Sequence, residues 1–125
     1  MEFVNLSDWE PDEKLKEAVL GALEDVGVDA GGITVAFVDR DYMASLKERF
    51  FGVKESTDVL TFTYDDVREV VVCPAHLGYD PHEIARRIFH GILHALGHDH
   101  KVKSKAPKME KLEKALMEAF RRRYG

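Results

Sequence analysis

Three histidines within eleven residues are the strongest chemical signal in this chain. His90, His94 and His100 lie in the segment HGILHALGHDH. Helical residues four apart share one face, so His90 and His94 can approach the same point. Gly97 allows the chain to reverse after the helix, which lets His100 return toward that point. Three neutral imidazoles with an open fourth position are typical of a catalytic zinc site, and the pattern predicts one Zn²⁺ per chain.

The alternative interpretation is two surface histidines with a third nearby by chance. At 100° per residue, His90 and His94 lie about 140° from the apolar stripe, which centres near Phe89 and Leu96. They therefore flank the core and do not fill it. The triple spacing, with its glycine, favours the metal.

The same spacing occurs in the metzincin protease motif H-E-x-x-H-x-x-G-x-x-H. In that motif a glutamate follows the first histidine and acts as general base. This chain has Gly91 there, and glycine cannot transfer a proton. The pattern therefore argues against peptide hydrolysis by the usual zincin route.

A well-marked helix must position the histidines. Asp80 is a natural N-cap, Pro81 suits the first helical position and Glu83 is predicted to complete a capping box. An apolar stripe at three and four spacing follows, and Gly97 is the expected stop.

The remaining elements predict a β-α-β-α-β-β-α-α order. Val59–Tyr64 and Glu69–Cys73 are close enough in sequence to form a hairpin, which predicts a mixed sheet. We expect an α/β (α+β) fold, with a small four-stranded sheet packed against about four helices, and one domain over residues 1–125. The other predicted strands are Glu2–Leu6 and Ile33–Val38. The other predicted helices run from about Leu15 to Val26, from Asp39 to Phe50 and from Pro107 to Arg123. A polar loop is predicted over Phe51–Asp58.

Composition limits the class of protein. The chain has 125 residues, a formal net charge of -5 and one cysteine, Cys73, which we expect to be a buried strand residue. No stretch approaches the roughly 20 apolar residues of a membrane span, and no basic-then-apolar signal begins the chain. These features predict a cytoplasmic protein with no membrane partner.

Several motifs together resemble the YbeY family of bacterial zinc-dependent endoribonucleases. The histidine segment is similar to the family signature H-G-x-L-H-L-x-G-Y-D-H, and Ser56–Phe62 (STDVLTF) to P-T-D-V-L-S/T-F. Glu83 matches a family glutamate seven residues before the first histidine. Met109 and Glu113 fit the M-x-x-x-E of the closing helix. The similarity spans about residues 33–120.

The resemblance implies zinc ligands at His90, His94 and His100. It further implies processing of the 3′ end of small-subunit ribosomal RNA, a role in ribosome quality control, and ribosomal RNA or the ribosome as partner. Thr57, Asp58 and Glu83 are candidates to line the cleft or support the ligands, although turn chemistry explains Thr57 and Asp58 equally well.

Two departures from the family pattern affect the catalytic assignment. Phe51 occupies the position of an arginine thought to face the active site, and His98 replaces a tyrosine. Arg49 or Lys54 could substitute for the arginine, with Arg87 as a further candidate cation. Asp99, beside a ligand, is a candidate general base or an anchor for a histidine.

Charge is distributed unevenly along the chain. Residues 101–125 carry nine Lys and Arg against three Asp and Glu, whereas residues 1–100 carry nine against twenty. The basic segment predicts weak RNA contacts at Arg121, Arg122 and Arg123, with a solvated helix as the alternative. No DNA partner is expected, and a monomer is favoured.

Three classes of function therefore stay open. The first is an RNA-cleaving zinc hydrolase. The second is a zinc hydrolase of another substrate. The third is a ribosome-associated protein that binds zinc but has little nuclease activity.

Overall fold

A computed structural model describes residues 1–98 and 105–125 of the chain. The predicted element order is confirmed, with one added turn of 3-10 helix, η1, between the last strand and the third α-helix. The elements are β1 (Glu2–Asn5), α1 (Glu13–Val26), β2 (Thr34–Phe37), α2 (Arg40–Phe51), β3 (Val59–Tyr64), β4 (Val67–Val72), η1 (Pro74–Leu77), α3 (Pro81–Ala95) and α4 (Ala106–Tyr124).

The four strands form one mixed sheet, as predicted, and the structure gives their order as β1-β2-β4-β3. β1 and β4 both run parallel to β2, and β3 returns antiparallel to β4 through a hairpin. The hairpin turn is Asp65 and Asp66, because Tyr64 pairs directly with Val67. β4 therefore begins two residues earlier than the sequence predicts.

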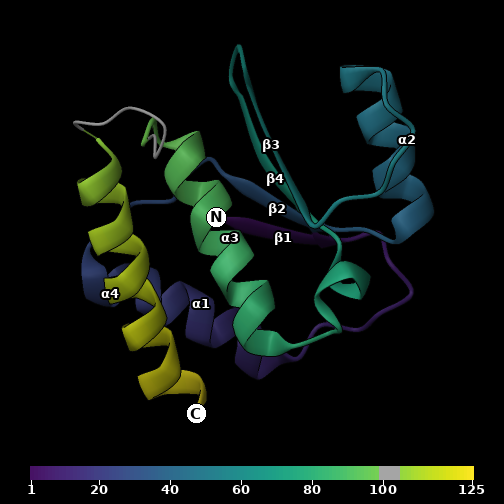
Figure 1. The fold of residues 1–125 in the computed structure, drawn as a ribbon. Helices are drawn as coiled ribbons and strands as arrows, with labels where there is room; N and C mark the ends of the chain where they lie inside the picture. The colour runs from purple at the N-terminus through teal and green to yellow at the C-terminus, as the bar shows by residue number, and fades with distance from the viewer. Residues whose placement is uncertain (99–104) are drawn as a thin grey trace.

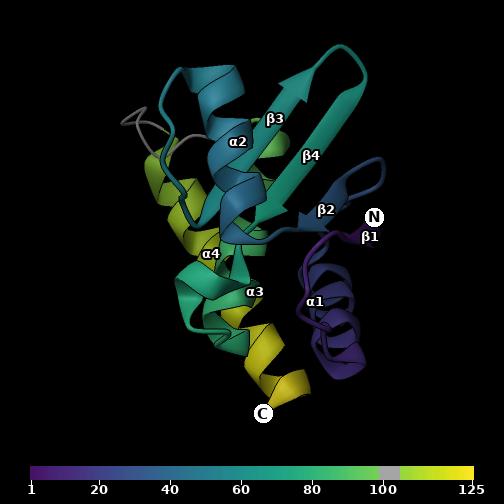
Figure 2. The same cartoon turned by 90° about the vertical axis from the view of Figure 1, so that its right-hand side faces the viewer.

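Helices cover both faces of this sheet, but unequally (Figures 1 and 2). The larger core lies under α1, α3 and α4 and includes Phe37, Val70 and Phe89. The smaller core lies under α2, where Met43 packs against Val71 and other buried residues. Val70 and Val71 alternate between the two faces, as neighbours on a strand must. The histidine helix α3 and the helix α2 are thus on opposite sides of the sheet.

Asp80 starts α3, but only half of the predicted capping box forms. The Asp80 carboxylate accepts from the backbone N–H of His82 at 2.9 Å and of Glu83 at 3.5 Å. The backbone N–H of Asp80, however, donates to the carbonyl of Leu77. Glu83 instead pairs with arginines further along the helix. The capping-box prediction for Glu83 is wrong, because η1 already supplies an acceptor to that N–H.

Gly97 ends α3 as predicted. Its φ is +92°, a left-handed conformation that glycine adopts without steric cost. The N–H of Gly97 donates to the carbonyl of His94, and the N–H of His98 donates to that of Leu93. These two bonds form a Schellman motif, which turns the chain away from the helix axis directly after the second histidine.

Gly91 allows α3 to approach the sheet closely. A Cβ atom at this position would collide with the Val70 side chain on β4 and crowd the Thr61 hydroxyl on β3. The face of α3 that carries Gly91 is therefore in contact with the strands. A glutamate could not occupy position 91 without displacing the Val70 side chain or the helix, which adds a steric reason to the absence of the protease base.

No helix in the described part of the chain is both long and apolar enough to cross a bilayer.

Candidate metal centre

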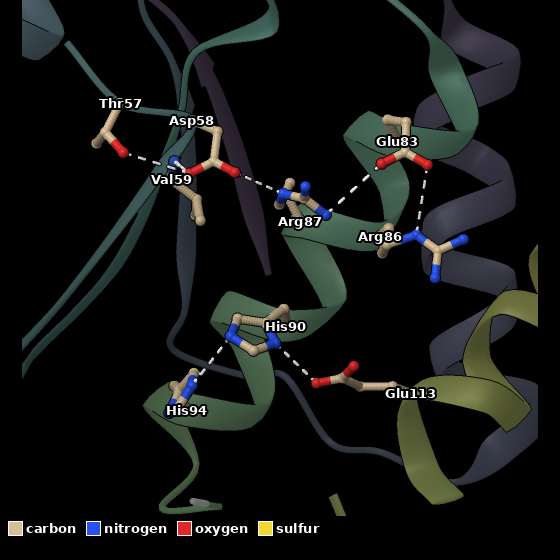
Figure 3. Close-up of polar contacts among 9 residues, drawn as sticks. All are labelled: Thr57, Asp58, Val59, Glu83, Arg86, Arg87, His90, His94 and Glu113. Atoms are coloured by element: carbon tan, nitrogen blue, oxygen red, sulfur yellow. Dashed lines mark hydrogen bonds and ion pairs between the residues drawn. The ribbon is translucent and has the colours of Figure 1, made fainter. Parts of the chain in front are cut away.

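The two helical histidines converge in the structure (Figure 3). The Nε2 atoms of His90 and His94 are 3.1 Å apart, and the ring centroids are separated by 4.6 Å. Both side chains are partly buried. One turn of α3 therefore presents two imidazole nitrogens to one point, as the spacing predicts.

Glu113 reaches His90 from α4. Its Oε1 atom lies 2.7 Å from Nδ1 of His90. An ionised carboxylate can only accept, so Nδ1 must carry the proton that it shares with Glu113. In the neutral ring this leaves the lone pair on Nε2, the nitrogen that faces His94. The contact therefore orients His90 and selects the tautomer that a metal ligand needs.

This arrangement fits zinc chemically. Two nitrogens bound to tetrahedral zinc at 2.0–2.1 Å would be about 3.4 Å apart, close to the 3.1 Å that separates the imidazole nitrogens. Within the described ranges, no three His, Cys, Asp or Glu side chains surround one point. His100 and Asp99, the predicted third ligand and candidate base, lie outside the described residues.

A second polar network lies one turn earlier on α3 and reaches the loop before β3. Nε of Arg87 donates to Oδ2 of Asp58 at 2.7 Å, and its Nη1 lies 3.6 Å from Glu83. The other Asp58 oxygen accepts from the N–H of Val59 at 2.8 Å and lies 3.4 Å from the Thr57 hydroxyl. Figure 3 shows this chain of contacts from the loop to the helix. Asp58 thus fastens the loop to the histidine helix.

Hydrogen bonding decides the charge state of Asp58. Partial burial raises the pKa of its carboxyl group, but the Arg87 guanidinium and the Val59 N–H bond to the ionised form. The latter contributions prevail, so the pKa of Asp58 lies below its ordinary value. Asp58 is therefore ionised near neutral pH and is held as a partner of Arg87, an arrangement unsuited to a proton carrier.

Both networks line one cleft of about 260 Å³. The lining includes Asp58 and Arg87 of one network and His90 and Glu113 of the other. Arg86, whose side chain is 44% exposed, completes the rim. The cleft thus brings an imidazole together with two guanidinium groups and the carboxylates of Asp58 and Glu113. Arg86 and Arg87 are the groups of this lining that can bind an anion.

The predicted substitutes for the missing arginine are located differently. Arg49 lies with Tyr42 and Leu46 on the outer side of α2, and that helix covers the sheet face opposite α3. Lys54 is exposed in the loop after α2. Phe51, the last residue of α2, has its ring centroid 6.4 Å from that of Phe62 on β3. The cations that line the cleft with His90 are Arg86 and Arg87.

The three arginines at the C-terminal end of α4 have different surroundings. Arg123 forms two bonds of 2.7 Å to Asp25 on α1, and its guanidinium lies directly over Gly21. Arg121 lines a groove between α3 and α4. Arg122 is exposed. The three arginines predicted as weak RNA contacts therefore have different surroundings, and their role in RNA binding stays a prediction.

The remaining histidines of the described residues, and Cys73, have local contacts. Nε2 of His76 is 2.6 Å from the Ser56 hydroxyl, and Nε2 of His82 is 2.9 Å from the carbonyl of Gly125. Cys73 is fully buried, as predicted, but it lies one residue beyond the end of β4 and so is not a strand residue. His98 is partly buried beyond the turn at the end of α3.

The sequence predicts no role for Arg86, and it marks Glu113 only as part of the M-x-x-x-E resemblance. Helical spacing relates residues on one helix, whereas Glu113 and His90 meet across two helices. The missed contact is therefore a product of how α4 packs on α3.

Comparisons with known proteins agree with this architecture. A family model described as endoribonuclease YbeY matches residues 5–121. An endoribonuclease YbeY of Rubrobacter xylanophilus is 33% identical over 119 aligned residues, which cover 89% of this chain and 86% of the relative. One of a Chelativorans species is 28% identical over 140 aligned positions, with 94% and 86% covered.

A solved structure has the same fold. The solution structure of TM1509 from Thermotoga maritima superposes with a TM-score of 0.65 at 26% identity, covering 94% of this chain and 88% of the other. Together with the match of the family model over residues 5–121, these likenesses show that the chain belongs to the endoribonuclease YbeY family.

Proposed function

We propose that this chain is a zinc-dependent endoribonuclease that acts in ribosomal RNA maturation, at the 3′ end of the small-subunit RNA, and in ribosome quality control. Family membership supports the RNA substrate. The observation that carries the metal assignment is the 3.1 Å approach of the His90 and His94 Nε2 atoms, with Glu113 bonded to the far side of the His90 ring. His100 is the proposed third ligand, one ion binds per chain, and the protein works in the cytoplasm. We further treat residues 1–125 as one domain, since both cores share one sheet.

The chain's own residues would bind and orient the phosphodiester. A zinc ion held by the histidines supplies Lewis acidity toward a phosphoryl oxygen and toward water. Arg87, fixed by Asp58 and Glu83, and the more exposed Arg86 would offset negative charge that builds on phosphorus. Asp99 is the proposed proton acceptor or histidine anchor. The roles that the sequence suggests for Arg49 and Lys54 become secondary in this scheme, because Arg86 and Arg87 line the cleft with His90.

One experiment separates the three classes of function. Purified wild type and His94→Ala are compared for bound zinc and for cleavage of ribosomal RNA and of a peptide substrate. We expect about one zinc per wild-type chain, endonucleolytic RNA products and no peptide products. His94→Ala should lose most of its zinc and at least about tenfold of its cleavage rate. A zinc-loaded wild type that leaves RNA intact under every metal condition contradicts the nuclease assignment and favours the binding protein.

A further inference from the structure

A groove of about 300 Å³ runs between α3 and α4 beside the cleft. Its floor includes Phe89 and Met117, whose exposed fractions are 0% and 3%. Such buried side chains cannot stack against nucleic acid bases, because their faces are already covered. Recognition in this groove must therefore come from the polar side chains along its rims.

The groove adjoins the cleft that holds His90. Arg86 and Glu113 line both depressions. Glu113 is also the residue bonded to His90. A ligand lying in the groove would therefore continue directly toward the proposed metal site.

Basic side chains follow the groove along its length. Arg86 contributes from α3, and Lys114 and Arg121 contribute from α4. Lys114 and Arg121 are seven residues apart, which is two helical turns or about 10 Å along the axis. Both are exposed, and Arg86 is half exposed with its Nε 3.5 Å from Glu83. The groove therefore has cationic side chains on both of the helices that form it.

Two acidic side chains also line the groove. One carboxylate oxygen of Glu113 accepts a hydrogen bond of 2.7 Å from His90. Glu110 is exposed, one helical turn before Lys114. With three basic and two acidic side chains, the groove lining has a net formal charge of +1. Binding of RNA here would therefore depend on several spaced phosphate contacts and not on one tightly held anion.

We propose that this groove between α3 and α4 binds the backbone phosphates of the single-stranded RNA that flanks the cleaved bond, through Arg86, Lys114 and Arg121. A narrow basic groove without available aromatic faces reads the backbone and not the bases. Binding here is consequently independent of sequence and sensitive to salt. The inference rests on the proposed RNA substrate, and it assigns the flanking RNA to this groove.

Binding of a fluorescein-labelled 12-nucleotide RNA to the full chain tests the groove. The triple variant Arg86→Gln, Lys114→Gln, Arg121→Gln is compared by anisotropy with a control triple variant, Lys14→Gln, Lys47→Gln, Arg68→Gln, whose positions line neither depression. Removing three phosphate contacts should lower the slope of log affinity against log salt by about 2, and affinity at 0.1 M salt by roughly 10- to 100-fold. The control should lose little of either. Equal losses in the two triple variants would overturn the proposal.

Removal of a negative charge from the groove should strengthen RNA binding, an effect that misfolding of a variant cannot imitate. Glu110→Gln removes a negative charge from the groove and should tighten RNA binding by about two- to fivefold. Glu118→Gln, an exposed position of the same helix outside the groove, should change little. If Glu110→Gln fails to tighten binding and the groove triple variant matches its control, the groove is not the RNA path.

The outcome is separable from the proposed nuclease function. Titrations use metal-free protein, so cleavage does not interfere with binding. If the zinc-loaded wild type leaves RNA uncut but the groove variant loses binding and salt dependence, the proposed activity fails and the groove stands. If RNA is cut and both triple variants bind alike, the activity stands and the groove fails.

Discussion

His90 is constrained from both of its ring nitrogens. Nδ1 bonds to Glu113 on α4, and Nε2 faces Nε2 of His94. A histidine held by a carboxylate has a fixed ring orientation and a more basic free nitrogen. Glu113 is therefore a positioning residue for the proposed ligand. Its replacement should change the affinity for metal more than the stability of the fold.

Glu113→Gln should weaken zinc binding by about 10- to 100-fold. The amide also offers a donor to Nδ1, which permits the tautomer with its proton on Nε2. Zinc affinity is measured by competition with a chelator, and the tautomer of His90 by nitrogen NMR of the metal-free protein. Glu118→Gln on the same helix is the matched control. An unchanged tautomer together with wild-type affinity would contradict the positioning role.

Asp58 links stability to pH. Its folded-state pKa lies below the ordinary value, because bonds from Arg87 and Val59 outweigh the opposing effect of burial. The stabilisation is therefore present above the unfolded pKa, near 4, and is lost as the pH falls through the folded pKa.

Asp58→Asn should be less stable than wild type at pH 7, and the difference should shrink as the pH is lowered below about 4. Urea denaturation at a series of pH values measures both proteins. Repeating the substitution in an Arg87→Met background should flatten most of this dependence, since the guanidinium is the charged partner. A pH dependence that survives intact in that background would assign the effect to another group.

At the scale of elements, three residues define α3: an N-cap aspartate, a glycine that ends the helix, and a second glycine that packs against the sheet. Asp80 caps the first turn and Gly97 ends the last. Gly91 places the helix that carries His90 and His94 closely against β3 and β4. The lack of a side chain at Gly91 therefore determines how closely the helix that carries the histidines packs on the strands.

Gly91→Ala should destabilise the fold by about 1–3 kcal/mol, although alanine is the better helix former by about 1 kcal/mol. The added methyl meets Val70 on a central strand, where neither backbone can easily move. Chemical denaturation gives the free energy of unfolding. Combining the change with Val70→Ala should recover part of the loss, because the two sites couple through the same contact. Simple additivity of the two effects would show that the collision is relieved elsewhere.

At the scale of the whole molecule, α4 joins distant parts of the chain. Arg123 pairs with Asp25 on α1, and Glu113 pairs with His90 on α3. In Figure 1 the yellow α4 lies alongside α3 with the purple α1 behind it. Metal binding at the histidines should therefore stabilise the docking of α4 as well as the site itself.

Zinc at 100 times its dissociation constant should raise the free energy of unfolding by about 2.7 kcal/mol. The gain should disappear in His94→Ala. Hydrogen exchange should slow in α4 as well as α3, because Glu113 connects the two helices. Thermal denaturation and exchange followed by mass spectrometry measure these effects. Added protection confined to α3 would mean that α4 does not share in the coupling.

The sequence alone determined the element order, the histidine helix and its ends. Those features depend on local periodicity, on capping by Asp80 and on the conformational freedom of Gly97, all of which act within a few residues. The same spacing argument predicted the approach of His90 and His94. The family resemblance added the expected substrate, which residue spacing could not supply.

Tertiary packing alone decided which charged groups meet the histidines. Arg49 is near the missing family position in sequence, yet α2 carries it to the opposite face of the sheet. Glu113 and Arg86 come to line one cleft because α4 packs against α3. The steric demand at Gly91 likewise depends on a strand about twenty residues away in sequence. Contacts between separate elements follow from how their faces pack, and no local pattern in the chain encodes that geometry.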